Sequence, residues 1–102
     1  MAAPPAARRS TPQTLRRIFN DGGFLERLQR GELRAVLLRD RHPSLEGAHE
    51  PFCTRSQAVA YLDANGTRVA LVHQYLRTDG SIGGSGLPDP KRILSEGEIL
   101  FV

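Results

Sequence analysis

The chain has 102 residues, a formal net charge of +3, 39% hydrophobic residues and a single cysteine. This length allows one domain with a modest core, which assembly into a homo-oligomer would help to stabilise. Cys53 alone excludes an internal disulfide framework. No long apolar run or export signal is present, so we expect a cytoplasmic protein without a membrane partner.

Arginine dominates the basic residues: only Lys91 is a lysine, and nine arginines lie in the first half of the chain. Because guanidinium groups bind phosphate and carboxylate in a two-pronged geometry, this bias favours a polyanionic partner, either nucleic acid or an acidic protein surface. A solvated helix face with Glu and Asp partners, or the codon bias of a GC-rich genome, would produce the same excess. No motif indicates a cofactor.

Residues 1–10 combine Ala, Pro and Arg and have nothing to bury, which predicts a disordered basic arm before a single domain over residues 11–102. Ser10 or Thr11 can cap a helix in which Pro12 occupies the first turn. The Asn-Asp-Gly-Gly sequence at 20–23 ends that helix. One apolar stripe follows from the helical spacing of Leu15, Ile18 and Phe19.

A second short helix is predicted from Phe24 to Arg30, where Gly31 has the position of a C-cap. Residues 33–39 form an apolar run that is either another helical turn or a buried strand, and we favour the strand.

The second half of the chain predicts two β-hairpins. The first surrounds Asn65-Gly66, a pair typical of a type I′ turn, and its register places Asp63 opposite Arg68 and Ala58 near His73. The second surrounds the turn at 95–97. The predicted fold is therefore α+β, with one or two N-terminal helices packed on a small, mostly antiparallel sheet of four or five strands.

Between these hairpins lies a Gly- and Pro-rich connection over residues 78–92. No GK[ST] sequence follows it, so a nucleotide-triphosphate loop is excluded, although its flanking basic residues could form a looser anion site. A connection this long is uncommon in so small a domain, and we expect it to be ordered by contacts.

The sequence HQYLRTDGSIGGSGLPDPKRIL, preceded by CTRSQAVAYLDANGTRVALV, resembles small uncharacterised proteins of GC-rich bacteria and their phages. The resemblance covers about the last half of the chain. It implies a mobile-element or phage setting and no particular activity or catalytic residue.

A metal-independent ribonuclease of toxin type is one hypothesis for the same stretch. Such chemistry needs a general acid and base and cations that hold the phosphate. The residues that could supply them are His73, Tyr75, Arg77, Asp79 and Lys91. His73 would be the acid or base, and Arg77 would hold the phosphate. The alternative is a structural histidine on an apolar strand face.

Zinc binding is a weaker hypothesis. The candidate ligands His42, His49, Cys53 and His73 are loosely spaced, and the ordinary reading is surface histidines with a buried cysteine. No family signature surrounds Cys53 to indicate a catalytic thiol.

The leading hypothesis is a non-enzymatic binding and assembly module that contacts a polyanion. Its predicted binding residues are Arg8, Arg9, Arg16 and Arg17 on the arm and first helix, and Arg77, Lys91 and Arg92 beside the Gly/Pro loop. The alternatives are the ribonuclease and a minor structural component of a phage particle, which would place the chain in the particle rather than free in the cytoplasm.

Overall fold

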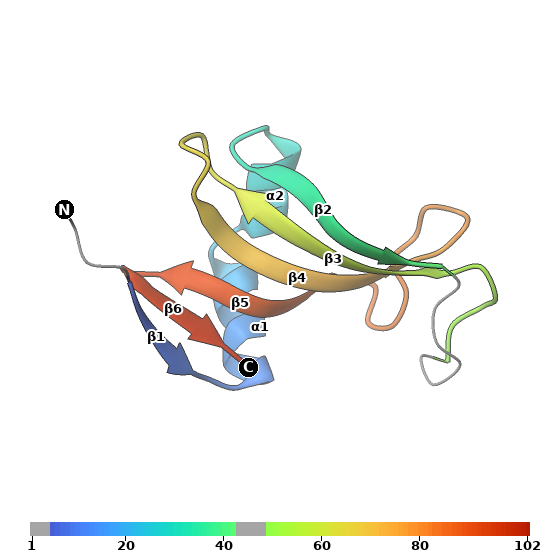
Figure 1. The fold of residues 1–102 in the computed structure, drawn as a ribbon, viewed down its shortest axis with the longest axis horizontal. Helices are drawn as coiled ribbons and strands as arrows, with labels where there is room; N and C mark the ends of the chain where they lie inside the picture. The colour runs from blue at the N-terminus through green and yellow to red at the C-terminus, as the bar shows by residue number, and fades with distance from the viewer. Residues whose placement is uncertain (1–4, 43–48) are drawn as a thin grey trace.

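The computed structural model describes residues 5–42 and 49–102, and it shows an α+β protein with two helices and a six-stranded sheet (Figure 1). The helices are α1 (Pro12–Asp21) and α2 (Phe24–Gln29). The strands are β1 (Ala6–Arg9), β2 (Arg34–Arg41), β3 (Arg55–Leu62), β4 (Arg68–Leu76), β5 (Asp89–Ser95) and β6 (Glu98–Phe101). The α+β class is as predicted, whereas the sheet has one strand more than the expected four or five.

The sheet has the order β1-β6-β5-β4-β3-β2, so β2 to β6 form an antiparallel meander and β1 is added at its edge. β1 runs parallel to β6, with Ala6 paired to Glu98 and Arg9 to Phe101. Part of the expected disordered arm is therefore a strand, because the open edge of β6 offers backbone donors and acceptors to the segment before α1. Residues 1–4 of the expected arm lie outside the described residues.

The helices begin and end where their capping residues predict. Thr11 is the N-cap of α1, and its Oγ1 accepts the Thr14 N–H at 3.1 Å. Gly23 separates the helices with a φ of 63°, a left-handed conformation that suits glycine. Both helices lie behind the sheet in Figure 1, and α1 packs mainly against β5.

The core lies between these helices and one face of the sheet. Phe19 is 2% exposed; its ring centroid lies 5.2 Å from that of Phe24 and 5.9 Å from that of Tyr61. The sheet contributes buried side chains from every second position of its central strands, including Val59, Tyr61, Ala70, Val72 and Ile93. The predicted stripe on α1 is confirmed at Leu15 and Phe19, which are buried, with Ile18 packed beside them.

The turns of the two hairpins differ in length and in backbone conformation. In the first, Asp63 Oδ1 accepts the N–H groups of Asn65 and Thr67, and Gly66 has a φ of 80°. Because a type I′ turn needs positive φ at both central residues and Asn65 does not have it, the type I′ prediction was wrong. The two-residue turn with positive φ at both positions is Glu96-Gly97, between β5 and β6.

None of the helices in the described part of the chain is both long and apolar enough to span a bilayer.

Candidate functional site

The sheet has two faces of different character. α1 and α2 cover one face, and the other face carries no helix in the described residues (Figure 1). Residues paired across neighbouring antiparallel strands point to the same face, so the strand register assigns each side chain to one side. We call the uncovered side the open face. On β3 it carries small side chains, those of Ser56, Ala58 and Ala60, which pair with Tyr75, His73 and Leu71 of β4.

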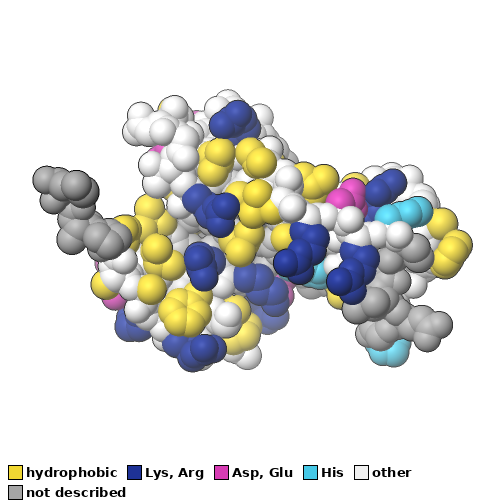
Figure 2. Space-filling model, in the orientation of Figure 1, with side chains coloured by type: hydrophobic (Ala, Val, Ile, Leu, Met, Phe, Trp, Pro, Cys, Tyr) yellow, Lys and Arg dark blue, Asp and Glu magenta, His cyan; other side chains and the backbone are white. Residues whose placement is uncertain are grey.

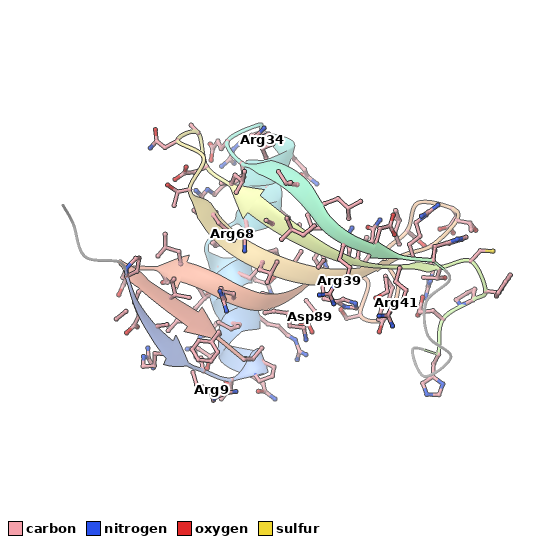
Figure 3. All side chains as sticks on the ribbon, viewed as in Figure 1. Arg9, Arg34, Arg39, Arg41, Arg68 and Asp89 are labelled. Atoms are coloured by element: carbon pink, nitrogen blue, oxygen red, sulfur yellow. The ribbon has the colours of Figure 1, made fainter. Side chains whose placement is uncertain are left out.

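Six arginines project from the open face, and we call them the open-face arginines: Arg9, Arg34, Arg39, Arg41, Arg68 and Arg92. Figure 3 labels five of them, from β1, β2 and β4. Figure 2 shows basic side chains spread over this side of the molecule, with the largest acidic patch near the right-hand end.

A β-bulge at Leu38 brings two of these arginines to the open face. The register shifts between Leu37 and Arg39, and a single extra residue reverses the face to which all following side chains point. Arg39 and Arg41 consequently share the open face with Arg34. Asp40 points to the opposite side, where its carboxylate forms an ion pair with Arg55 at 3.1 Å.

A bulge in β4 acts in the same way. In β4 the extra residue is Val69, so that Arg68 pairs with Leu62 on the open face rather than following Ala70 and Val72 into the core. Without this bulge, simple alternation from Ala70 would direct Arg68 toward the helices. Arg92 of β5 needs no bulge, because it follows the buried Ile93 in the alternation and pairs with Leu71 on the open face.

Ion pairing separates the open face from the rest of the molecule. Within residues 5–42 and 49–102, none of the open-face arginines has a carboxylate partner within 4.0 Å. The paired arginines all lie elsewhere: Arg8, Arg16, Arg27, Arg30, Arg55 and Arg77. Such uncompensated cations on one surface produce a positive potential that attracts anions.

His73 lies at the centre of the open face between two cavities. A cavity of about 200 Å³ on one side is lined by Arg39, Arg41, Ser56, Gln57, Ala58 and His73 itself. A larger one of about 300 Å³ lies toward the Gly/Pro loop, with Tyr75, Lys91 and Asp89 in its wall. His73 Nε2 shares a hydrogen bond of 2.8 Å with Ser56 Oγ, and its ring meets that of Tyr75 edge-on at 4.7 Å between centroids.

Burial lowers the pKa of His73 below its ordinary value of 6.5, and the Lys91 ammonium lowers it further, while Asp89 acts in the opposite direction. The imidazole is therefore uncharged at neutral pH. An uncharged ring can accept a proton from a neighbouring group, and its hydrogen bond to Ser56 can orient that hydroxyl toward a ligand.

The structure separates the predicted polyanion-binding residues into two groups. Arg8 pairs with Glu98 at 3.0 Å, and Arg16 and Lys91 both pair with Asp89, at 3.3 and 2.8 Å. These cations are compensated. Three of the predicted residues have no ion-pair partner among the described residues: Arg17, which is exposed on α1, and Arg9 and Arg92 on the open face.

The Gly/Pro loop is held by a clasp rather than open to a ligand. Glu50 accepts from Arg77 Nε at 2.9 Å and from the Gly84 N–H at 3.2 Å, and its side chain is only 6% exposed. A Cβ atom at Gly83 would overlap the Glu50 carboxylate, so the glycine there makes room for the clasp. The loop is therefore held in place by contacts, as we expected from its length.

The predicted ribonuclease residues are only partly brought together. His73, Tyr75 and Lys91 line the larger cavity, but the Arg77 guanidinium, the predicted phosphate clamp, is engaged by Glu50. Asp79 instead accepts from the Ser81 N–H and hydroxyl at 2.8 and 2.6 Å, closing a turn at the loop tip. Neither residue lines the cavity beside His73.

The candidate zinc ligands do not converge. No group of three or more His, Cys, Asp or Glu side chains with the geometry of a metal site occurs in the part of the chain that the structure describes. His73 bonds to Ser56, whereas His49 and Cys53 lie in the connection before β3 with positive φ values of 54° and 74°.

Sequence reasoning missed four of the open-face arginines: Arg34, Arg39, Arg41 and Arg68. Arg34, Arg39 and Arg41 belong to the basic first half of the chain and Arg68 to the second half, and strict alternation along their strands would divide the four between the two faces. Comparisons with protein-family models, with curated proteins and with solved structures found no match to this chain.

Proposed function

We propose that this protein is a non-enzymatic nucleic-acid-binding module that uses the open face of its sheet to contact phosphate groups. The observation that carries this proposal is the separation of charge described above: six arginines without ion-pair partners in the described residues share the open face, and the ion-paired arginines lie elsewhere. The binding surface therefore moves from the arm and loop predicted from the sequence to the face of the sheet.

The spacing of the arginines supports a repeating anionic ligand. Arg34 and Arg68 lie in one cross-strand row, separated by Leu62, and Arg92 and Arg9 lie in another, separated by Phe101. Two strand spacings correspond to about 10 Å, a distance that extended guanidinium groups can bridge along a phosphate backbone.

The aromatic rings of the open face favour backbone contacts over base stacking. The Arg9 guanidinium lies over the Phe101 ring at 5.1 Å from its centroid, and the His73 and Tyr75 rings pack against each other in a T-shaped contact. Because stacking recognition of single strands needs rings that are free for bases, we expect little sequence preference.

A salt titration of binding to a short labelled RNA tests the proposal. Each phosphate contact contributes about 0.7 to the slope of log affinity against log salt for a single strand, so Arg68→Gln/Arg92→Gln should reduce the slope by about 1.4. Arg17→Gln/Arg30→Gln removes the same charge from α1 and from the C-cap of α2, outside the open face, and should leave the slope unchanged. Equal losses in both proteins would mean that net charge, and not this face, governs binding.

Cleavage of RNA is the second candidate, and the uncharged His73 beside Tyr75 and Lys91 is the observation that favours it. The RNA recovered from the titration, run on a denaturing gel after incubation with chelator, separates the two functions. If the unaltered protein shortens the RNA and His73→Gln does not, the protein is a nuclease rather than a binding module. Circular dichroism must show that the His73→Gln protein remains folded.

A further inference from the structure

We propose that the cavity between β2 and β4, with Arg39, Arg41, Ser56 and His73 in its wall, is a phosphate-binding pocket. If the pocket binds a phosphate of a nucleic-acid backbone, the inference rests on the proposed function. If it binds a free phosphate group, the inference is independent of that function.

Three strands assemble the pocket. Ser56 and Ala58 of β3 are small, so they leave a trough between the longer side chains of the neighbouring strands. Arg39 pairs with Ala58, which in turn pairs with His73, and Arg41 pairs with Ser56. The arginines and the imidazole are thus held about 10 Å apart at their backbones, two strand spacings, with the cavity of about 200 Å³ between them.

The charges of the lining residues match a phosphate group. Both arginines lack an ion-pair partner in the described residues, and no carboxylate of that part of the chain lines the cavity. The carboxylate nearest in sequence, Asp40, is directed to the opposite side of the sheet by the bulge and pairs there with Arg55. Two guanidinium groups can therefore donate to phosphate oxygens without first breaking an ion pair, which is the arrangement that makes arginine an effective phosphate ligand.

The Ser56–His73 hydrogen bond supplies a neutral donor at the floor. When the uncharged imidazole carries its proton on Nε2, it donates to Ser56 Oγ, and the hydroxyl proton is then available to a phosphate oxygen. When the proton is on Nδ1, the hydroxyl donates to Nε2 instead. A bound phosphate selects the first arrangement, so His73 orients the hydroxyl rather than contacting the ligand itself.

Several charged or titratable groups surround the His73 ring from neighbouring elements, and the negative charge of a bound phosphate would add to their effect on the pKa of the ring. Burial and Lys91 keep the ring uncharged, and a bound dianion would raise the pKa of His73 toward its ordinary value. The ring is therefore a reporter of occupancy. The groups that face this site are Arg39 and Arg41 from β2, Ser56 from β3, Tyr75 from β4, and Asp89 and Lys91 from β5.

The test is a titration of the full chain with inorganic phosphate at constant ionic strength, followed through the imidazole C–H signals by NMR. We expect the His73 signals to shift saturably, while those of His49, which does not line the cavity, stay unchanged. Arg39→Gln/Arg41→Gln should weaken phosphate binding about tenfold or more, and Ser56→Ala by about three- to tenfold. Arg34→Gln/Arg68→Gln removes two charges from the same face but outside the pocket and should change the affinity less than about twofold.

Unchanged His73 signals, or equal weakening by the two arginine pairs, would overturn the pocket and leave the proposed function to its own RNA titration. A short oligouridylate distinguishes the sources of the phosphate. If Arg39→Gln/Arg41→Gln weakens oligouridylate binding more than Arg34→Gln/Arg68→Gln does, the pocket takes a backbone phosphate. If inorganic phosphate occupies the pocket but oligouridylate affinity is the same in both pairs, the ligand is a free phosphate group, and the backbone assignment fails.

Discussion

The two faces of the sheet are made from the same strands, yet one face carries mainly buried apolar side chains and the other carries exposed arginines. The face toward α1 and α2 carries the buried apolar side chains, and Asp40, which points to that side, is paired with Arg55. The open face carries six arginines for which the described residues provide no carboxylate. Burial of apolar area is what stabilises the fold, whereas unpaired like charges on neighbouring strands oppose it slightly.

Under the proposed function, the open-face arginines serve a ligand rather than the fold. A polyanion that neutralises them would relieve their mutual repulsion and would favour the folded state, in which the bulges of β2 and β4 bring Arg39, Arg41 and Arg68 to the same face as the others. Substitutions on the covered face should therefore lower the free energy of unfolding with little effect on RNA affinity. Substitutions of the open-face arginines should lower RNA affinity with little effect on stability.

The largest effect is expected from the covered face. Phe19→Ala removes a ring that is 2% exposed and packed between Phe24 and Tyr61. Its loss should lower the free energy of unfolding by about 3–5 kcal/mol, through lost burial and the cavity left behind. Chemical denaturation followed by circular dichroism measures this change. A loss below about 1 kcal/mol would contradict the assignment of Phe19 to the centre of the core.

A smaller effect, on affinity, is expected from exchanging two adjacent residues. Arg39→Asp/Asp40→Arg keeps composition and net charge, but it places a carboxylate on the open face and an arginine on the covered side. RNA affinity at low salt should fall by about tenfold or more, because an anion now lines the phosphate pocket. Fluorescence anisotropy measures it, with Arg39→Gln as the intermediate case. An unchanged affinity would show that the bulge at Leu38 does not decide which charges the ligand meets.

The smallest effect concerns the loop clasp and depends on pH. The hydrogen bond from Arg77 is the main cause that lowers the pKa of Glu50 below its ordinary value of 4.5. The stabilisation that this carboxylate provides is therefore present above about pH 4.5 and is lost as the pH falls through the lower, folded-state pKa.

Glu50→Gln should consequently reduce the urea midpoint at pH 7, and its stability should converge with that of the unaltered protein in acid. RNA affinity at pH 7 should not change, because the clasp lies outside the open face. Parallel stability curves at every pH would contradict an ionised, hydrogen-bonded Glu50.

Local signals in the sequence predicted much of the fold. Capping by Thr11 and the glycines after Asn20 located both helices, because these signals act within one turn of the chain. The β3–β4 register was correct from Ala58 to Tyr61, where core residues on one face oppose slippage. It failed at Leu62, which pairs with Arg68, because the turn at 63–67 is longer than the predicted type I′ turn.

The composition by itself determined that nearly all cationic side chains of this protein are arginines, and the apolar pattern predicted which residues form the core. Only the tertiary structure decided which arginines lie together on one face of the sheet. Alternation along a strand holds until a bulge reverses it, and bulges depend on pairing with a neighbouring strand that one strand's own sequence does not specify. The same pairing turned Ala6–Arg9 into β1 and assigned Arg8 to an ion pair with Glu98 while leaving Arg9 on the open face.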